Sequence, residues 1–109
     1  MSDNRSRQEL IHQIVQKIVA GCGPEKIILF GSSVCGAPRP QSDLDVLVIM
    51  DTTLPPRERS VRLRQAIGPV GIPLDLFVLT PEEYQESKDV IGGIAYAPAQ
   101  YGRIVYEKS

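Results

Sequence analysis

Cysteine and histidine, which supply most zinc ligands in proteins, are scarce in this sequence, with only Cys22, Cys35 and His12. The two cysteines do not show the spacing of a metal-binding pair, and no further ligand of a suitable type accompanies them. We therefore expect two reduced thiols in a cytoplasmic protein, and neither a zinc site nor a disulfide framework. His12 lies off the apolar stripe of its helix, so we expect a solvated side chain without a catalytic role.

Long apolar runs and an excess of one charge are also missing. No stretch approaches the roughly 20 residues that a membrane span needs, and the polar N-terminus does not resemble a signal peptide. Twelve Lys and Arg residues face 13 Asp and Glu residues, so the net charge of −1 gives no broad reason to bind nucleic acid or an anionic membrane. Without repeats or a linker, we expect a single domain over residues 1–109 with one modest core.

Apolar residues recur at helical spacing in some segments and form short runs typical of buried strands in others. Helices are expected at residues 6–20, 57–67 and from 81 to about 88, with a further helical turn at 99–102. Strands are expected at residues 25–30, 43–50, 74–79 and 103–106. The segment 89–98 permits two interpretations, a helix–loop passage or a mobile flap.

Two of the expected helices carry more specific signals. Thr80, Pro81 and Glu83 have the pattern of a capping box with proline at the first helical position. The helix at 57–67 is expected to have an apolar inner side and a basic exposed side, formed respectively by Val61, Leu63, Ala66 and Ile67 and by Arg57, Arg59, Arg62 and Arg64. A solvated surface is the simpler interpretation of these arginines, and the alternatives are docking of an acidic partner or phosphate binding.

The most informative stretch joins the first two expected strands. The first strand ends at Phe30 and is followed by Gly31 and Ser32 at the rim of a sheet. Glycine has no Cβ and lets other groups approach closely, and the serine offers a hydroxyl and a backbone N–H, so this turn suits an anion. The second strand opens with Asp43 and Asp45, which share one face because side chains alternate along a strand. Two neighbouring carboxylates repel each other, and a divalent cation offsets that repulsion best.

A third carboxylate, Asp75, lies in the otherwise apolar strand at 74–79. An unpaired carboxylate on a largely buried strand is costly, so Asp75 is expected to have a partner. An exposed strand end or a pairing arginine would explain it structurally. With Asp43 and Asp45 nearby in mind, we favour a third acidic ligand.

The pattern of Gly31-Ser32, ten residues and Asp43-x-Asp45 resembles the signature of the DNA polymerase β-type nucleotidyltransferase superfamily. In length and flanking strands the chain is similar to its minimal branch, the MNT-type antitoxins, and the similarity extends to residues 73–79 and, more loosely, to the 101–107 tail. The resemblance implies an α/β (α+β) fold, a small mixed β-sheet flanked by helices, with edge structure at the tail.

The resemblance also implies chemistry. Asp43, Asp45 and Asp75 would hold two Mg²⁺ ions around a nucleoside triphosphate, with ATP expected from the family, while Gly31, Ser32 and Ser33 bind its phosphates. The implied reaction transfers a nucleoside monophosphate to a hydroxyl, with pyrophosphate released. In the MNT-type branch the acceptor and partner is a HEPN-family toxin, neutralised by adenylylation of a hydroxyl side chain.

One departure from the family keeps alternatives open. Small members often read Gly-Ser-Arg-Ala-Arg-Gly after the strand, whereas Ser33 and Cys35 stand where those arginines would be. Neither residue replaces a bidentate phosphate donor, so Arg39 or a partner would have to supply the charge. The alternative function is a catalytically weak or inactive binding module that masks its partner. Transfer to an aminoglycoside is a weaker third hypothesis, because no second domain is evident to hold a sugar.

Overall fold

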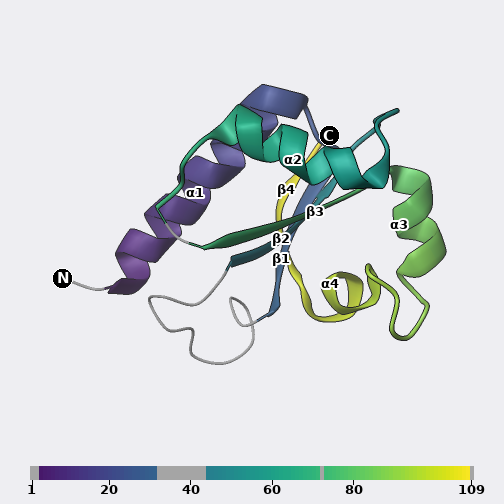
Figure 1. The fold of residues 1–109 in the computed structure, drawn as a ribbon. Coiled ribbons are helices and arrows are strands. Elements are labelled where there is room, and N and C mark those ends of the chain that lie inside the picture. The colour runs from purple at the N-terminus through teal and green to yellow at the C-terminus, as the bar shows by residue number, and fades with distance from the viewer. Residues whose placement is uncertain (1–2, 32–43, 72, 109) are drawn as a thin grey trace.

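Four helices and four strands make up the described part of the chain (Figure 1). The computed structural model describes residues 3–31, 44–71 and 73–108, with side chains described from residue 8 onwards. In chain order the elements are α1 (Asp3–Cys22), β1 (Lys26–Phe30), β2 (Leu44–Ile49), α2 (Pro56–Ile67), β3 (Leu74–Leu79), α3 (Pro81–Ser87), α4 (Tyr96–Tyr101) and β4 (Arg103–Glu107).

The strands form one mixed sheet in the order β3-β2-β1-β4. β1 runs antiparallel to both β2 and β4, whereas β2 and β3 are parallel and joined by the α2 crossover. β4 pairs only with β1, so the interpretation of the tail as edge structure is confirmed. The small mixed sheet flanked by helices, expected from the family resemblance, is therefore present.

Helices cover both faces of the sheet (Figure 1). On one face α1 and α2 lie side by side and pack on the sheet through a cluster that includes Ile14, Ile18, Leu63 and Ile67. On the other face α3, α4 and the segment between them pack on a second cluster around Leu47. β2 is buried on both sides because it is the strand from which both clusters are built, which explains its nearly continuous apolar sequence.

Most of the expected elements are present within a few residues of their predicted bounds. α1 extends two residues beyond the prediction at its C-terminal end, and the Thr80–Glu83 capping box is formed as predicted. The last helix was placed wrongly, because α4 begins at Tyr96 and contains Pro98. Proline is tolerated there because an amide in the first turn has no intrahelical partner to lose. Residues 88–95 are a series of turns, and His12 is exposed as expected.

The predicted inner side of α2 was partly wrong. Arg59 is only 8% exposed and is buried together with Leu63 and Ile67, whereas Val61 is 54% exposed. Residues 59, 63 and 67 follow each other at intervals of four and therefore form one stripe of the helix. The burial of Arg59 was not predicted, because arginine was expected only on the exposed side of the helix.

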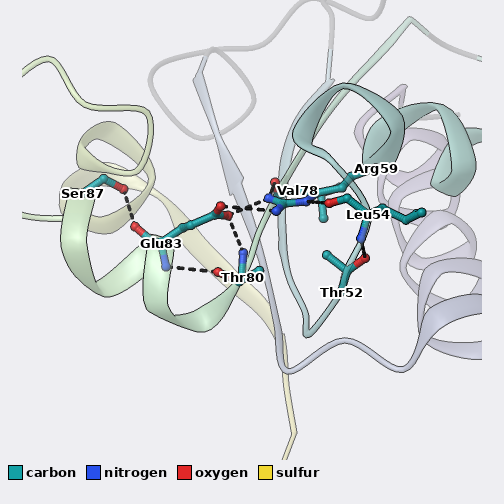
Figure 2. A network of polar contacts seen from close by, with 7 residues as sticks. All are labelled: Thr52, Leu54, Arg59, Val78, Thr80, Glu83 and Ser87. Carbon is teal, nitrogen blue, oxygen red and sulfur yellow. Dashed lines mark hydrogen bonds and ion pairs between the residues drawn. The ribbon is translucent and has the colours of Figure 1, made fainter.

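Arg59 connects three elements through its guanidinium group (Figure 2). Its Nε donates to the carbonyl oxygen of Leu54 at 2.9 Å and its Nη1 to that of Val78 at 3.4 Å. Its Nη1 and Nη2 also form a bidentate ion pair with Glu83, at 2.6 and 3.3 Å. Glu83 in turn accepts from the Thr80 amide, so the capping box of α3 is held by a residue of α2. The hydrogen bond from Arg59, followed by that from Thr80, holds the pKa of Glu83 below its ordinary value of 4.5.

Arginines of α2 also cover the free edge of β3. The carbonyls of Pro73 and Leu79 accept hydrogen bonds from the β2 side, so those of Leu74 and Val78 point away from the sheet. Arg64 donates to Leu74 at 2.5 Å and Arg59 donates to Val78, which pairs two carbonyls that the sheet leaves open. Charged side chains that cover the open carbonyls of an edge strand hinder its pairing with a strand of another molecule.

We expect Arg59→Met to lower the free energy of unfolding by about 2 kcal/mol, because two carbonyls and the Glu83 carboxylate lose a charged donor. Arg57→Met, an exposed control on the same helix, should change stability by less than about 0.5 kcal/mol. Urea titration measures both. Equal effects would contradict a structural role for the Arg59 contacts.

The same variant should change the pH dependence of stability. The pKa of Glu83 is lower in the folded protein than its ordinary value of 4.5. The ionised carboxylate therefore stabilises the fold at a pH above about 4.5, and this contribution is lost as the pH falls through the lower pKa of the folded state. Urea titrations at several pH values between about 3 and 6 should show a smaller acid-induced loss in Arg59→Met than in the wild type.

Candidate functional site

Two of the predicted acidic residues lie side by side at one end of the sheet. Asp45 on β2 and Asp75 on β3 are direct partners in the parallel register. Partners in neighbouring strands are about 5 Å apart along the sheet and point to the same face. The half-buried Asp45 and the exposed Asp75 therefore form an acidic pair that solvent can reach.

Gly31 lies against the carboxylate of Asp45. Its φ of +76° belongs to the left-handed region that favours glycine. A Cβ at this position would lie 3.2 Å from Cγ of Asp45 and closer still to Oδ2. Glycine is therefore needed here for two reasons, the backbone conformation and the close approach of a carboxylate. The turn after β1 and the acidic pair belong to one site.

An aromatic pair borders the carboxylates on the same face. Phe30 is the antiparallel partner of Asp45, and Phe77 follows Asp75 by two residues, so all four side chains point to one side of the sheet. The two rings are tilted, with centroids 5.6 Å apart. These partly buried rings place apolar surface on the same face as the acidic pair, and apolar surroundings strengthen the attraction of carboxylates for a cation. Phe30 and Phe77 were not predicted as site residues, although Phe77 follows Asp75 by two residues in the sequence and therefore shares its face of the strand.

The remaining predicted site residues, Asp43, Ser32 and Ser33, lie outside the described residues, as does Arg39. Within residues 3–31, 44–71 and 73–108, no group of three or more His, Cys, Asp or Glu side chains is placed to hold a metal ion. Asp75 is exposed near the start of β3, as in the structural alternative of an exposed strand end, so desolvation does not require a partner for its carboxylate. What supports its role is its register with Asp45.

The donor set at this site suits a hard divalent cation. Two carboxylates side by side provide oxygen ligands of the kind that Mg²⁺ prefers, and they leave room for water and phosphate oxygens in its coordination shell. The exposure of Asp75 leaves the pair open to a ligand from solvent. The arrangement can therefore bind a metal–phosphate complex next to a glycine turn.

Comparison with known proteins gives a family and a fold. The model of the nucleotidyltransferase domain family matches residues 9–102. A proposed nucleotidyltransferase from Sulfolobus solfataricus has a similar structure, with 17% identity and a TM-score of 0.64 over 92% of this chain and 79% of its own. A mutant of the toxin–antitoxin MntA–HpeT has 18% identity and a TM-score of 0.49 over 100% of this chain and 76% of its own. No curated protein matches the chain.

We expect Gly31→Ala to destabilise the protein by at least about 2 kcal/mol, because left-handed backbone strain adds to the contact with Asp45. Gly23→Ala is the matched control, since Gly23 has a φ of +56° and nothing within 4 Å of an added Cβ. The control should cost about 1 kcal/mol. Chemical unfolding measures both variants.

A double-mutant cycle isolates the contact with the carboxylate. In an Asp45→Ala background, Gly31→Ala should cost about 1 kcal/mol less than in the wild type, whereas the cost of Gly23→Ala should not change. Full additivity of Gly31→Ala and Asp45→Ala would show that the turn and the carboxylate are independent.

Proposed function

Because the chain belongs to the nucleotidyltransferase domain family, we propose that it is a Mg²⁺-dependent nucleotidyltransferase acting on a hydroxyl group of a partner protein. The observation that carries the proposal is the pairing of Asp45 with Asp75 beside the Gly31 turn. The family resemblance expected from the glycine–serine and aspartate motif is confirmed at the level of the superfamily. Substrate, metal, partner and site residues are our inferences.

Asp45, Asp75 and Asp43 would hold Mg²⁺, which when bound neutralises the triphosphate and the charge that develops on pyrophosphate. Gly31, Ser32 and Ser33 would hold the β- and γ-phosphates, since a glycine turn exposes backbone N–H groups to an anion. Asp75, which is exposed, would take a proton from an incoming hydroxyl.

The reaction forms a bond between the acceptor oxygen and the α-phosphorus and breaks the bond from that phosphorus to the bridging oxygen of the β-phosphate. The hydroxyl proton passes to a carboxylate or to water, and the electron pair of the broken bond leaves on pyrophosphate. We propose ATP as the donor, because the resemblance to MNT-type antitoxins implies adenylylation. The same resemblance suggests a cytoplasmic HEPN-family toxin as the acceptor.

A masking function is the second candidate, and the sequence of the phosphate loop favours it. Ser33 and Cys35 occupy positions where similar small proteins carry arginines. Without these donors the chain would bind a triphosphate weakly and neutralise its partner by covering it.

No membrane-spanning helix is found among the helices that the structure describes.

Isothermal titration of ATP, GTP, CTP and UTP with and without Mg²⁺ tests the proposal without knowledge of the acceptor. We expect one nucleotide to bind only with Mg²⁺, and Asp45→Asn to weaken this binding at least about tenfold, because one anionic metal ligand is lost. Asp51→Asn is the control, since Asp51 is exposed just beyond the opposite end of β2. It should leave binding unchanged.

Absence of Mg²⁺-dependent binding for every nucleotide would contradict the proposed enzymatic function and leave the masking function as the candidate. Neutralisation of a toxin partner then separates the two functions. Substitution of Asp43 and Asp45 together should abolish neutralisation by an enzyme and leave neutralisation by a masking protein intact.

A further inference from the structure

A cavity of about 360 Å³ lies at the end of the sheet away from the acidic pair. The C-terminal end of α1, the connection after β2 and the helix α2 surround it. Met50, at its wall, follows Asp45 by five residues along an extended strand, which places it roughly 16 Å away. The cavity is therefore separate from the proposed nucleotide site, and its volume is in the range of small-molecule pockets.

The walls of the cavity combine apolar side chains with two guanidinium groups. The apolar part includes Cys22, Leu54, Leu63 and Val78, and the cationic part is Arg59 and Arg62. Such a mixture suits a ligand with a short apolar body and an anionic end.

Arg59 retains one donor after its contacts within the protein. A guanidinium has five N–H groups, and four of them are used by Leu54, Val78 and the two oxygens of Glu83. The fifth, on Nη2, lies on the same side of the planar group as Nε–H, which donates to Leu54. Leu54 is itself part of the cavity wall. A side chain that is 8% exposed thus keeps a charged donor on the cavity side.

Arg62 supplies the second cationic group. It is exposed on α2, and no carboxylate in the described part of the chain forms an ion pair with it. Arg59 reaches the interior and has its charge balanced by Glu83, whereas the described residues provide no such ion pair for Arg62. An anion that enters between them would gain hydrogen bonds from a fixed donor and from a mobile one.

We propose that this cavity binds a small monocarboxylate with a short aliphatic body, whose carboxylate contacts Arg62 and the remaining N–H of Arg59. The aliphatic part occupies the space between Leu63 and Cys22. The cavity volume lies at the lower end of the range in which small molecules bind, so a straight chain of about six carbons is a suitable probe. This site is independent of the proposed nucleotide chemistry, since it shares no residue with the acidic pair.

Protection of Cys22 reports on occupancy at the site itself. In a Cys35→Ser chain Cys22 is the only thiol, and burial raises the pKa of that thiol, so modification by N-ethylmaleimide is followed at about pH 8.5. Hexanoate should slow the reaction in a saturable way, with half-protection at millimolar concentration. Hexanamide, which has the same body without the charge, should be at least about tenfold less effective.

Variants on α2 test the role of charge. Arg62→Ala should raise the hexanoate concentration for half-protection about tenfold, whereas Arg57→Ala, on the same helix but outside the cavity, should leave it unchanged. Equal protection by hexanoate and hexanamide, or equal protection in Arg62→Ala and the wild type, would overturn the proposal.

Amide chemical shifts decide the outcome should Cys22 react too slowly to follow. Titration of ¹⁵N-labelled protein with hexanoate should shift the signals of Cys22, Thr52 and Leu63, which line the cavity, and leave that of Asp75 in place. Absence of such shifts at about 50 mM hexanoate would refute the site. Neither measurement requires nucleotide binding. A failure of the proposed carboxylate site is therefore distinguishable from a failure of the proposed nucleotidyltransferase function.

Discussion

The parallel register between β2 and β3 is the constraint on which the site depends. It places Asp45 beside Asp75, and the same pairing puts Val46 beside Leu76 in the core. A slip of one residue would turn Asp75 into the core and expose a row of apolar side chains, so burial of the apolar row also fixes the position of the carboxylate. The burial of the core and the position of the acidic pair both follow from the same alternation of side chains along a strand.

Charged groups lie at both ends of this pair of strands. Asp45 and Asp75 lie where β2 and β3 begin, where Arg64 also contacts the carbonyl of Leu74, and the ion pair of Arg59 with Glu83 lies where β3 ends. The ion pair between Arg59 and Glu83 is partly buried and pays for desolvation, and its benefit lies in the number of groups it joins. It holds the end of β3, the start of α3 and the connection after β2 in one arrangement. This arrangement leaves one guanidinium N–H of Arg59 beside the cavity that Arg59 and Arg62 line.

Local sequence was sufficient wherever a single element decided the result. The capping box at Thr80 and the apolar runs of the strands were predicted because their signals come from neighbouring residues. The prediction failed for Arg59 and for Pro98. Arg59 is buried because acceptors from three other segments meet it, and Pro98 belongs to a helix whose start carries no capping side chain. Neither cause is visible in a local pattern.

The sequence by itself determined the strands, the glycine turn and the residue types of the candidate site. The apolar runs and their spacing place Gly31 directly after one strand and Asp45 in the next strand along the chain. Only the tertiary structure decided which carboxylates meet. The pairing of Asp75 with Asp45 spans 30 residues and requires the α2 crossover to return the chain beside β2. It also placed Phe30 against Phe77 and turned Arg59 inward, since contacts between segments distant in sequence depend on how the helices pack on the sheet.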